Sequence, residues 1–315
     1  MINIWGFRWG VDRMIDFTGC EIDRLKAYGG SNGKKIRILY QGEHYMLKFP
    51  PEARKVKEMS YTNGCISEYL ACNILALMGM DVQKTLLGKY RLQNGVYKTV
   101  AACGDFTDED TALMEFAELK NTCIDSSEEG YGSELASILD AIDTQMIYDP
   151  LAVRERFWDM FIADAFLGNF DRHNGNWGFL VNRRERKVSL APVYDCGSCL
   201  YPQLSEEQMG NVLRNETEIE KRIFVFPTSA IKEDGRKINY YEYIHSLKNP
   251  DCNAALKRIC SKIDMEKIGR FLDGAEIPGI YKKFVKIMLG QRKEKLLDAS
   301  LEKLKKKERK QHKVL

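Results

Sequence analysis

The pattern of apolar and polar positions divides the chain into a strand-rich first part and a longer helix-rich part. In the first hundred residues, short apolar runs are separated by glycine-containing turns, which is typical of β-hairpins. Beyond about Asp105, apolar positions recur three or four residues apart, which indicates amphipathic helices. One strand-like segment, 177–195, interrupts the helical part and predicts a further hairpin around its polar turn at 182–186.

The individual elements can be placed by residue number. We expect two hairpins, at 35–49 and 86–103 with Asn94-Gly95 at its turn, and a helix from about 65 to 80. Further helices are expected at 112–121, 132–147, 151–168, 254–273 and 278–309. Together these elements predict an α+β chain of two lobes. Residues 1–104 would form a small β-rich nucleotide-binding lobe, and residues 105–315 a mainly helical catalytic lobe with a basic tail.

Composition excludes several classes of protein. Hydrophobic residues make up 44% of the chain and charged residues 30%, the balance of a globular protein. No apolar run approaches the roughly 18–20 residues that span a bilayer, and the first residues lack the apolar core of a signal peptide. The nine cysteines, an odd number spread over the whole chain, indicate reduced thiols rather than a disulfide framework. We therefore expect a cytoplasmic protein without a membrane span.

The net charge of +3 comes from one end of the chain. Residues 301–315 hold seven lysines and arginines against two glutamates, so the remainder carries about −2. A nucleic-acid footprint would place the excess on a folded face, whereas a terminal run is typical of a solvated helix end. No nucleic-acid partner is expected. A zinc site is not indicated either, because Cys196 and Cys199 form the only CxxC pair in the chain.

The most informative chemistry lies in the stretch GNFDRHNGNW, residues 168–177, between an apolar helix and the predicted hairpin. Asp171 and Asn176 lie five residues apart, and Asp195 ends the second strand of that hairpin. Antiparallel pairing would bring Asn176 and Asp195 together at the open end of the ribbon. Carboxylate and amide oxygens suit Mg²⁺ bound to a nucleotide phosphate. Asp171 is then left to receive a hydroxyl proton. The alternative is that these are ordinary turn and strand-end residues.

The first lobe offers complementary groups. The glycine-rich loop can present backbone N–H groups to phosphates, although most such loops are only turns; it comprises Gly29, Gly30, Ser31, Asn32 and Gly33. Lys48 lies within a predicted strand, and Glu68 is the only charged residue from 65 to 80. A semi-buried carboxylate needs a partner, and Lys48 is the natural candidate. The alternatives are a lysine on an exposed strand face and a surface glutamate.

In chain order, these groups follow the layout of protein kinases: glycine loop, strand lysine, helix glutamate, Asp-x4-Asn and a final aspartate. Neither G-x-G-x-x-G nor GxxxxGK[ST] occurs, so Rossmann and Walker-type sites are not indicated.

The stretch GNFDRHNGNWGFL followed by LAPVYD resembles the HipA-like serine/threonine kinases, and the likeness extends over about residues 15–300, including YMLKFPP and YTNGCISEYLAC. The resemblance implies a two-lobed protein-kinase-like fold, ATP with Mg²⁺, and phosphorylation of serine or threonine in a protein substrate. By position, Asp171 would be the catalytic base, Asn176 and Asp195 the metal ligands, and Lys48 the phosphate-binding lysine. The ATP-binding set would also include Glu68, His173 and the hinge residues Ala102, Cys103 and Asp105. Ser31 matches the serine that family members autophosphorylate.

Two departures from the longer toxins of this family affect what the resemblance implies. We expect the chain to lack their extra amino-terminal subdomain, which argues against the usual antitoxin relationship. Its glycine loop also differs from theirs, which weakens the assignment of Ser31. Delivery to a host without a signal peptide would also fit the resemblance. Three other activities remain open. They are a lipid kinase of the phosphoinositide type, which also uses a DRHNxN loop, a small-molecule phosphotransferase and a non-catalytic nucleotide-binding regulator.

Overall fold

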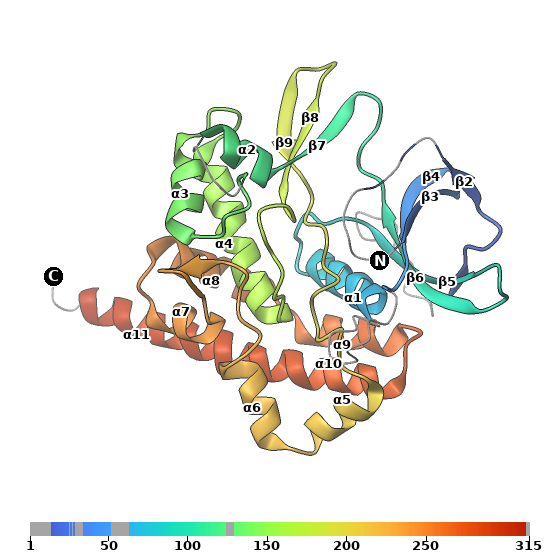
Figure 1. Ribbon diagram of the computed structural model, residues 1–315. Helices are drawn as coiled ribbons and strands as arrows, with labels where there is room; N and C mark the ends of the chain where they lie inside the picture. Colours follow the sequence, from blue (N-terminus) through green and yellow to red (C-terminus); the bar gives the residue numbers. More distant parts are fainter. Residues whose placement is uncertain are drawn as a thin grey trace.

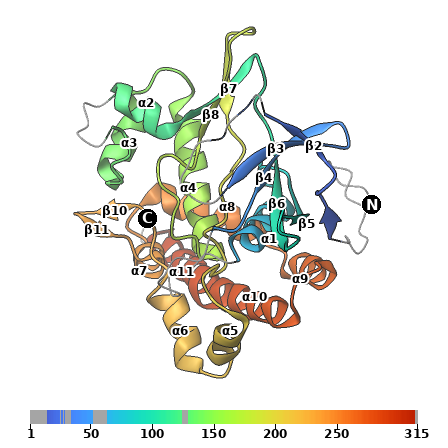
Figure 2. The same ribbon diagram turned by 45° about the vertical axis from the view of Figure 1, so that its right-hand side comes forward.

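The computed structural model describes residues 14–24, 26, 28, 34–51, 63–123 and 129–312. A curled β-sheet lies on one side of the molecule and most of the helices lie on the other (Figures 1 and 2). The six-stranded sheet has the order β1-β5-β6-β4-β3-β2, and within it only the β1–β5 pair is parallel. Its strands are β1 (Ile15–Asp16), β2 (Glu21–Asp23), β3 (Lys35–Tyr40), β4 (Glu43–Lys48), β5 (Thr85–Arg91) and β6 (Tyr97–Gly104).

Both hairpins expected in the first part are confirmed. β3 and β4 pair in the register Tyr40↔Glu43, so Gln41 and Gly42 form a two-residue turn. Both turn residues have positive φ, 51° and 80°, which matches the right-handed twist of the flanking strands. In the second hairpin, Arg91 pairs with Tyr97 and Gly95 has a φ of 83° in the turn.

The two faces of the β3–β4 ribbon have different roles. Side chains on one face are buried in a small core that includes Ile38, Tyr45 and Leu47. The opposite face carries Lys35 and Arg37 of β3 directly across from Lys48 and Met46 of β4. Because successive side chains of a strand point to opposite faces, these four share the face away from the small core.

Helix α1 (Gly64–Leu77) lies between the sheet and the helical part (Figure 1). Every residue from Cys65 to Leu75 is buried, which fits its lack of charged positions other than Glu68. Its Tyr69 packs against Phe271, with ring centroids 5.7 Å apart. The main hydrophobic core runs from α1 into the large helical part. α1 therefore packs against both parts of the molecule, against β5 and β6 of the sheet and against α9 (Met265–Gly274) of the helical part.

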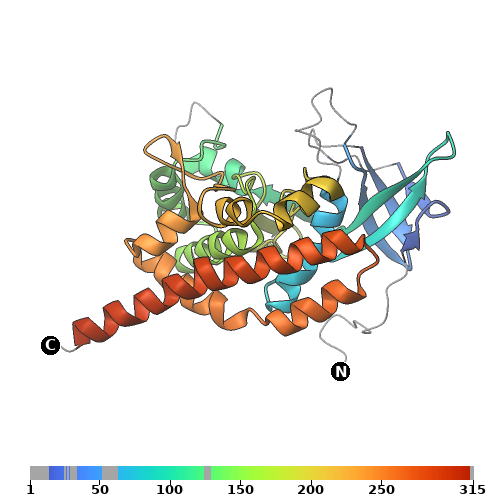
Figure 3. The same ribbon diagram turned by 90° about the horizontal axis from the view of Figure 1, so that it is seen from below.

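The larger part is mainly helical, which confirms the α+β fold class. A continuous helical rod formed by α10, a π-helical turn and α11 crosses its lower face and projects past the body toward the C-terminus (Figure 3). The helices are α2 (Phe116–Cys123), α3 (Leu135–Thr144), α4 (Pro150–Leu167), α5 (Glu206–Leu213), α6 (Glu216–Phe224), α7 (Tyr240–Ser246), α8 (Pro250–Lys262), α9 (Met265–Gly274), α10 (Gly279–Gln291), the π-helix Arg292–Asp298 and α11 (Ala299–His312). Short strands add β7 (Thr111–Glu115), β8 (Gly178–Asn182) and β9 (Lys187–Leu190), which form one sheet, and the pair β10 (Lys232–Glu233) and β11 (Arg236–Lys237).

Three expectations for the helical part are corrected. Residues 112–115 of the expected helix 112–121 belong to β7 instead, because they pair with β8 in a register that places Met114 opposite Phe179. The expected helix 254–273 is two helices, because the Asp264 side chain accepts hydrogen bonds from the amides of Glu266 and Lys267 and so begins α9. Helices α5, α6 and α7 were not expected, although Ser205 and Gln208 form a capping box at the start of α5.

Two further observations concern the whole described chain. Among the described residues, no helix has both the length and the apolar character needed to cross a membrane. All nine cysteines lie in the described ranges, and each of them is a free thiol.

Candidate active site

A cavity of about 830 Å³ lies between the six-stranded sheet and the helical part. Its volume is within the usual range for small-molecule sites. Residues from β3, β4, α1, β7, the segment 105–108, the loop 171–176 and the segment 194–198 line it. Lys48, Glu68, Asp171, Asn176 and Asp195 are all lining residues, so the cavity brings together groups separated by as many as 147 positions in the sequence.

Lys48 is held by two carboxylates. Its Nζ lies 2.9 Å from Glu68 Oε2 and 3.0 Å from Asp195 Oδ1. The contact with Glu68 is the one predicted from the sequence. Burial favours a neutral lysine, but the two carboxylates outweigh it and hold the pKa of Lys48 well above its usual value. Burial also raises the pKa of Glu68, against the opposing effect of Lys48. Glu68 Oε1 in addition accepts a hydrogen bond from the amide of Cys196.

Asp195 reaches this position by a route that differs from the expected ribbon. Strand β9 ends at Leu190, and the chain then leaves the β8–β9 hairpin. Val193 instead forms a parallel bridge with Val82, and the amide of Gln83 donates to Val193 O. Asp195 follows with a φ of 55°, a left-handed conformation that aspartate tolerates better than most residues. The charge of Lys48 lowers the pKa of Asp195 to about 2, so this carboxylate is ionised at neutral pH.

The loop after α4 is fixed by a buried ion pair. Gly168 ends α4 with a φ of 68°. Arg172, only 5% exposed, then donates to the carboxylate of Asp164 in α4, with 3.1 Å between Nε and Oδ2. Arg172 Nη1 also donates to the carbonyls of Asn176 and Tyr194. One side chain thus connects the loop 171–176 to the segment that carries Asp195.

Asp171 and Asn176 are connected directly. The Asn176 amide nitrogen donates to Asp171 O at 2.8 Å, which leaves the amide oxygen available for a ligand. The Asp171 carboxylate lines the cavity, and burial raises its pKa. The charge of Asp195 adds to this rise, and His173 opposes it. A carboxylate with a raised pKa is a better proton acceptor, as a general base requires.

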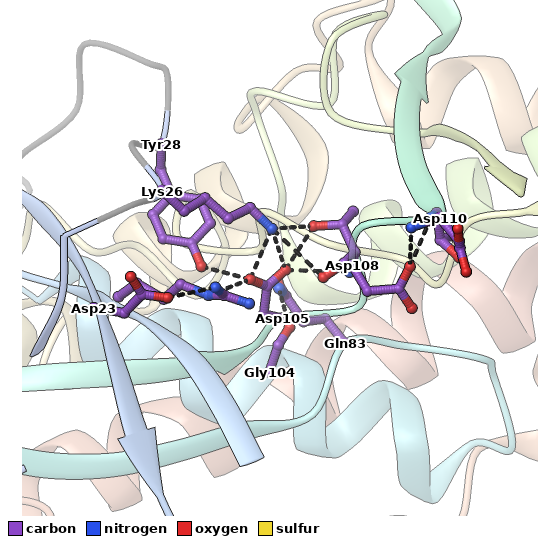
Figure 4. Close-up of polar contacts among 11 residues, drawn as sticks. Asp23, Lys26, Tyr28, Gln83, Gly104, Asp105, Asp108 and Asp110 are labelled. Atoms are coloured by element: carbon purple, nitrogen blue, oxygen red, sulfur yellow. Dashed lines mark hydrogen bonds and ion pairs between the residues drawn. The ribbon is translucent and has the colours of Figure 1, made fainter. Parts of the chain in front are cut away.

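The remaining expected ATP-binding residues have different positions. His173 lines the cavity, and its Nδ1 accepts a hydrogen bond from the amide of Gly175. Ala102 and Cys103 are fully buried within β6 and are not among the described residues that line the cavity. Asp105 does line it, but its carboxylate is bound by Lys26, Tyr28 and Arg37 (Figure 4). Gly29, Gly30, Ser31, Asn32 and Gly33 lie outside the described residues.

Two contributors to the site were not predicted from the sequence. One is the Arg172–Asp164 pair, whose signal was an arginine beside Asp171 and an acidic residue in the apolar run before it. The other is Lys35, which lies directly opposite Lys48 and lines the cavity. Burial and the charge of Lys48 lower the pKa of Lys35. Two like charges directly opposite each other are unfavourable unless anions lie nearby. The sequence predicted a three-residue turn at 41–43, which would place Lys35 opposite Phe49, whereas the two-residue turn places it opposite Lys48.

The charges of the site fit a phosphate-bound divalent cation. Lys48 and Lys35 face Glu68, Asp195 and Asp171 across one cavity, so the carboxylates outnumber the lysines among these residues. The ionised Asp195 and the available oxygen of Asn176 are the hard oxygen donors that Mg²⁺ takes. Mg²⁺ commonly uses only one or two protein carboxylates and completes its shell with water and phosphate oxygens.

Comparisons with known proteins agree with this arrangement. The family model described as HipA-like C-terminal domain matches residues 27–266. The chain is 48% identical over 288 residues to the serine/threonine-protein kinase CtkA of Helicobacter pylori strain J99, covering 91% of this chain and 87% of the relative.

Two solved structures share the fold. A crystal structure of a Helicobacter pylori proinflammatory kinase CtkA matches with a TM-score of 0.85 and 46% identity, covering 92% of this chain and 98% of the other. HipA of Shewanella oneidensis MR-1, solved with HipB and its operator DNA, matches at a TM-score of 0.51 and 14% identity over 89% of this chain and 70% of the other, which shows the fold alone. By the family model and by CtkA, this chain belongs to the family of proteins with a HipA-like C-terminal domain.

Proposed function

We propose that the protein is an ATP- and Mg²⁺-dependent serine/threonine protein kinase. The observation that carries the proposal is Lys48 Nζ held between Glu68 and Asp195 in the same cavity as Asp171 and Asn176. This set of groups is the one that protein kinases use for phosphoryl transfer. The name of the 48% identical relative, serine/threonine-protein kinase CtkA, supports the same activity.

The residues of this chain take separate roles in the transfer. Lys48, oriented by Glu68, contacts phosphates of ATP, and Lys35 adds a second positive charge beside it. Asp171 accepts the proton of the substrate hydroxyl as that oxygen bonds to the γ-phosphorus. The bond between the γ-phosphorus and the bridging oxygen breaks, and ADP leaves with the electron pair. Arg172 acts at a distance from the reaction, because it holds the loop 171–176 beside the segment of Asp195.

Asn176 and Asp195 would hold the divalent cation. When bound, Mg²⁺ neutralises the charge of the phosphates and so favours transfer of the γ-phosphoryl group. The Asn176 side chain is oriented for this role by its hydrogen bond to Asp171 O. The Asp195 side chain is 45% exposed, so a ligand can approach it from the cavity.

The substrate would be a protein with a serine or threonine acceptor, and an antitoxin-like protein would be a second partner. The antitoxin-like partner is proposed because HipA of Shewanella oneidensis, a toxin–antitoxin protein, was solved with HipB. Stable co-purification of a protein of the same organism with this chain would support it.

A labelling experiment tests the activity and separates it from the lipid-kinase alternative, which neither named relative favours. Purified protein is incubated with γ-labelled ATP and Mg²⁺, either with a protein lysate or with phosphoinositide vesicles. We expect label in protein bands as phosphoserine or phosphothreonine, and none with Asp171→Asn. Label in lipid, or none in either sample, would contradict the proposal. Asp110→Asn is the matched control, because the Asp110 side chain is half exposed and its only ion pair among the described residues is with Arg184.

A further inference from the structure

Asp105 is the centre of a second charged cluster in the cavity wall (Figure 4). Its side chain is only 4% exposed. Oδ2 accepts hydrogen bonds from Lys26 at 2.8 Å, from the Tyr28 hydroxyl at 2.7 Å and from Arg37 at 3.1 Å. Oδ1 accepts from the amide and hydroxyl of Thr107. No acceptor position of this carboxylate is left for a nucleotide, which differs from the adenine-holding role expected for Asp105.

The partners of Asp105 come from three separate segments. Lys26 and Tyr28 belong to the connection between β2 and β3, Arg37 to β3, and Thr107 to the segment between β6 and β7. Lys26, Tyr28 and Thr107 also line the cavity. The carboxylate therefore fixes part of the β2–β3 connection against the segment that follows β6, and both become one wall of the cavity.

This wall lies at the end of the cavity away from Lys48. Lys48 pairs with Ala101, and the amide of Asp105 donates to His44 O, four residues back along β4. At about 3.4 Å per residue, the two positions lie about 14 Å apart along the strand. That separation is comparable to the length of a nucleoside triphosphate. With phosphates at Lys48, the base of the nucleotide reaches the wall that contains Asp105.

The chemistry of the wall suits a base rather than phosphates. The charge of Lys26 is matched by Asp105, and Arg37 lies between Asp105 and Asp23. The aromatic ring of Tyr28 is held in place through its hydroxyl, with Lys26 Nζ 5.4 Å from its centroid. A fixed aromatic ring in a cavity wall is a stacking surface for a nucleotide base.

We propose that Asp105 is a positioning residue for nucleotide binding, which holds Tyr28 in the cavity wall so that its ring contacts the base of ATP. The inference rests on the proposed kinase function and assigns roles in ATP binding to Tyr28 and Asp105. Tyr28 contacts the base, and Asp105 acts on ATP binding through Tyr28.

The test compares ATP affinity, measured by direct titration, with kcat at saturating ATP. Loss of hydrogen bonds to a buried charge predicts an ATP Kd about tenfold higher in Asp105→Ala, with kcat changed less than about threefold. Tyr28→Leu should raise Kd similarly because it removes the ring, and Tyr28→Phe should raise it less because it removes only the hydroxyl. Asp110→Asn, on the same connecting segment, should bind ATP like the wild type. Far-ultraviolet circular dichroism and the thermal midpoint identify variants that have lost their fold.

The double variant Asp105→Ala/Tyr28→Leu distinguishes positioning from a general loss of structure. If Asp105 acts through Tyr28, the double variant binds ATP about as well as Tyr28→Leu alone. Fully multiplicative effects would overturn the proposal, as would a wild-type Kd in Tyr28→Leu or a loss confined to kcat. If Asp105→Ala does not fold, Tyr28→Phe and Tyr28→Leu decide the matter alone. A wild-type protein that binds ATP without transferring phosphate would contradict the proposed function and leave this test intact.

Discussion

The two charged clusters in the cavity differ in their balance of charge. Around Lys48, the carboxylates of Glu68, Asp195 and Asp171 outnumber Lys48 and Lys35. Around Asp105, the positive charges of Lys26 and Arg37 are matched by the carboxylates of Asp105 and Asp23. The pKa values follow this difference. Burial raises the pKa of Glu68 and of Asp171, whereas hydrogen bonds from Lys26, Thr107 and Tyr28 overcome burial and lower that of Asp105 to about 2.

This difference suggests that the Lys48 cluster binds a charged ligand, whereas the Asp105 cluster stabilises the fold. An excess of carboxylate charge in a cavity is unfavourable unless a cation is near, so we expect ligands to complete the Lys48 cluster. The Asp105 cluster is satisfied by the chain itself. Substitutions in the first cluster should therefore affect turnover and metal dependence, and those in the second should affect affinity and stability.

The largest effect is expected for Asp171→Asn. Removing the proton acceptor should lower kcat by about 10³-fold, within the range for general bases, while the shape of the loop is kept. ATP affinity should stay within about twofold of wild type, since hydrogen bonding through Asp171 O is preserved. Single-turnover kinetics together with ATP titration measure both quantities. Near-normal turnover would show that another group accepts the proton.

The Lys48–Glu68 pair is next in size. Lys48→Met should reduce kcat/KM by about 10²-fold, and Glu68→Gln by about tenfold, because Glu68 acts by orienting Lys48. The double variant should be about as impaired as Lys48→Met alone, since residues that act as one unit are not additive. Steady-state kinetics of the four proteins test this. Multiplicative losses would mean that the ion pair does not contribute as a unit.

Substitutions in the two clusters should differ in their effect on the free energy of unfolding. The lowering of the Asp105 pKa from 3.8 to about 2 corresponds to about 2 kcal/mol, which Asp105→Asn should remove from the free energy of unfolding at neutral pH. Because the folded pKa is lowered, this contribution is present above about pH 4 and is lost as the pH falls through about 2. Glu68→Gln should cost much less, since burial disfavours its charge. Urea unfolding at several pH values measures both, and equal costs would remove the distinction.

Asp195→Asn should weaken the dependence of ATP binding on Mg²⁺. It removes one carboxylate from the cation site, so ATP affinity at high Mg²⁺ should fall by about tenfold, with less change at low Mg²⁺. Titrating ATP at several Mg²⁺ concentrations provides the comparison. The same Mg²⁺ dependence in wild type and variant would exclude Asp195 as a ligand.

The smallest effect concerns pH. Burial, together with the charge of Asp195, raises the pKa of Asp171. In a plot of kcat/KM against pH, the fall on the acid side should therefore occur at a higher pH than for an ordinary aspartate. Activity falls as the pH decreases through this pKa, because the base becomes protonated. Asp195→Asn removes one cause of the rise and should move the limb to lower pH. A limb that does not move would mean that another group controls it.

Much of the chemistry could be read from the sequence because it depends on residue type and local spacing. Glycine-containing turns at 41–43 and at Asn94-Gly95 indicated both hairpins, although the first turn proved to be one residue shorter. Asp171 and Asn176 lie on one short loop. The lone Glu68 in an apolar helix required a partner, and the structure provides Lys48. The turns and the loop depend on interactions between residues close in the sequence, and the partner of Glu68 follows from the cost of burying an unpaired charge.

The tertiary structure decided the rest. β7 forms where periodicity indicated the start of a helix, because pairing with β8 outweighs the weak helical preference of residues 112–115. Asp195 reaches Lys48 through a bridge between Val193 and Val82, not through the ribbon that its position after β9 suggested. The sequence placed Asp105 in the connection between the lobes and Tyr28 near a glycine loop, but their contact spans 77 positions. Residue type and spacing determined which groups this protein carries, whereas only long-range pairing and packing determined which of them meet.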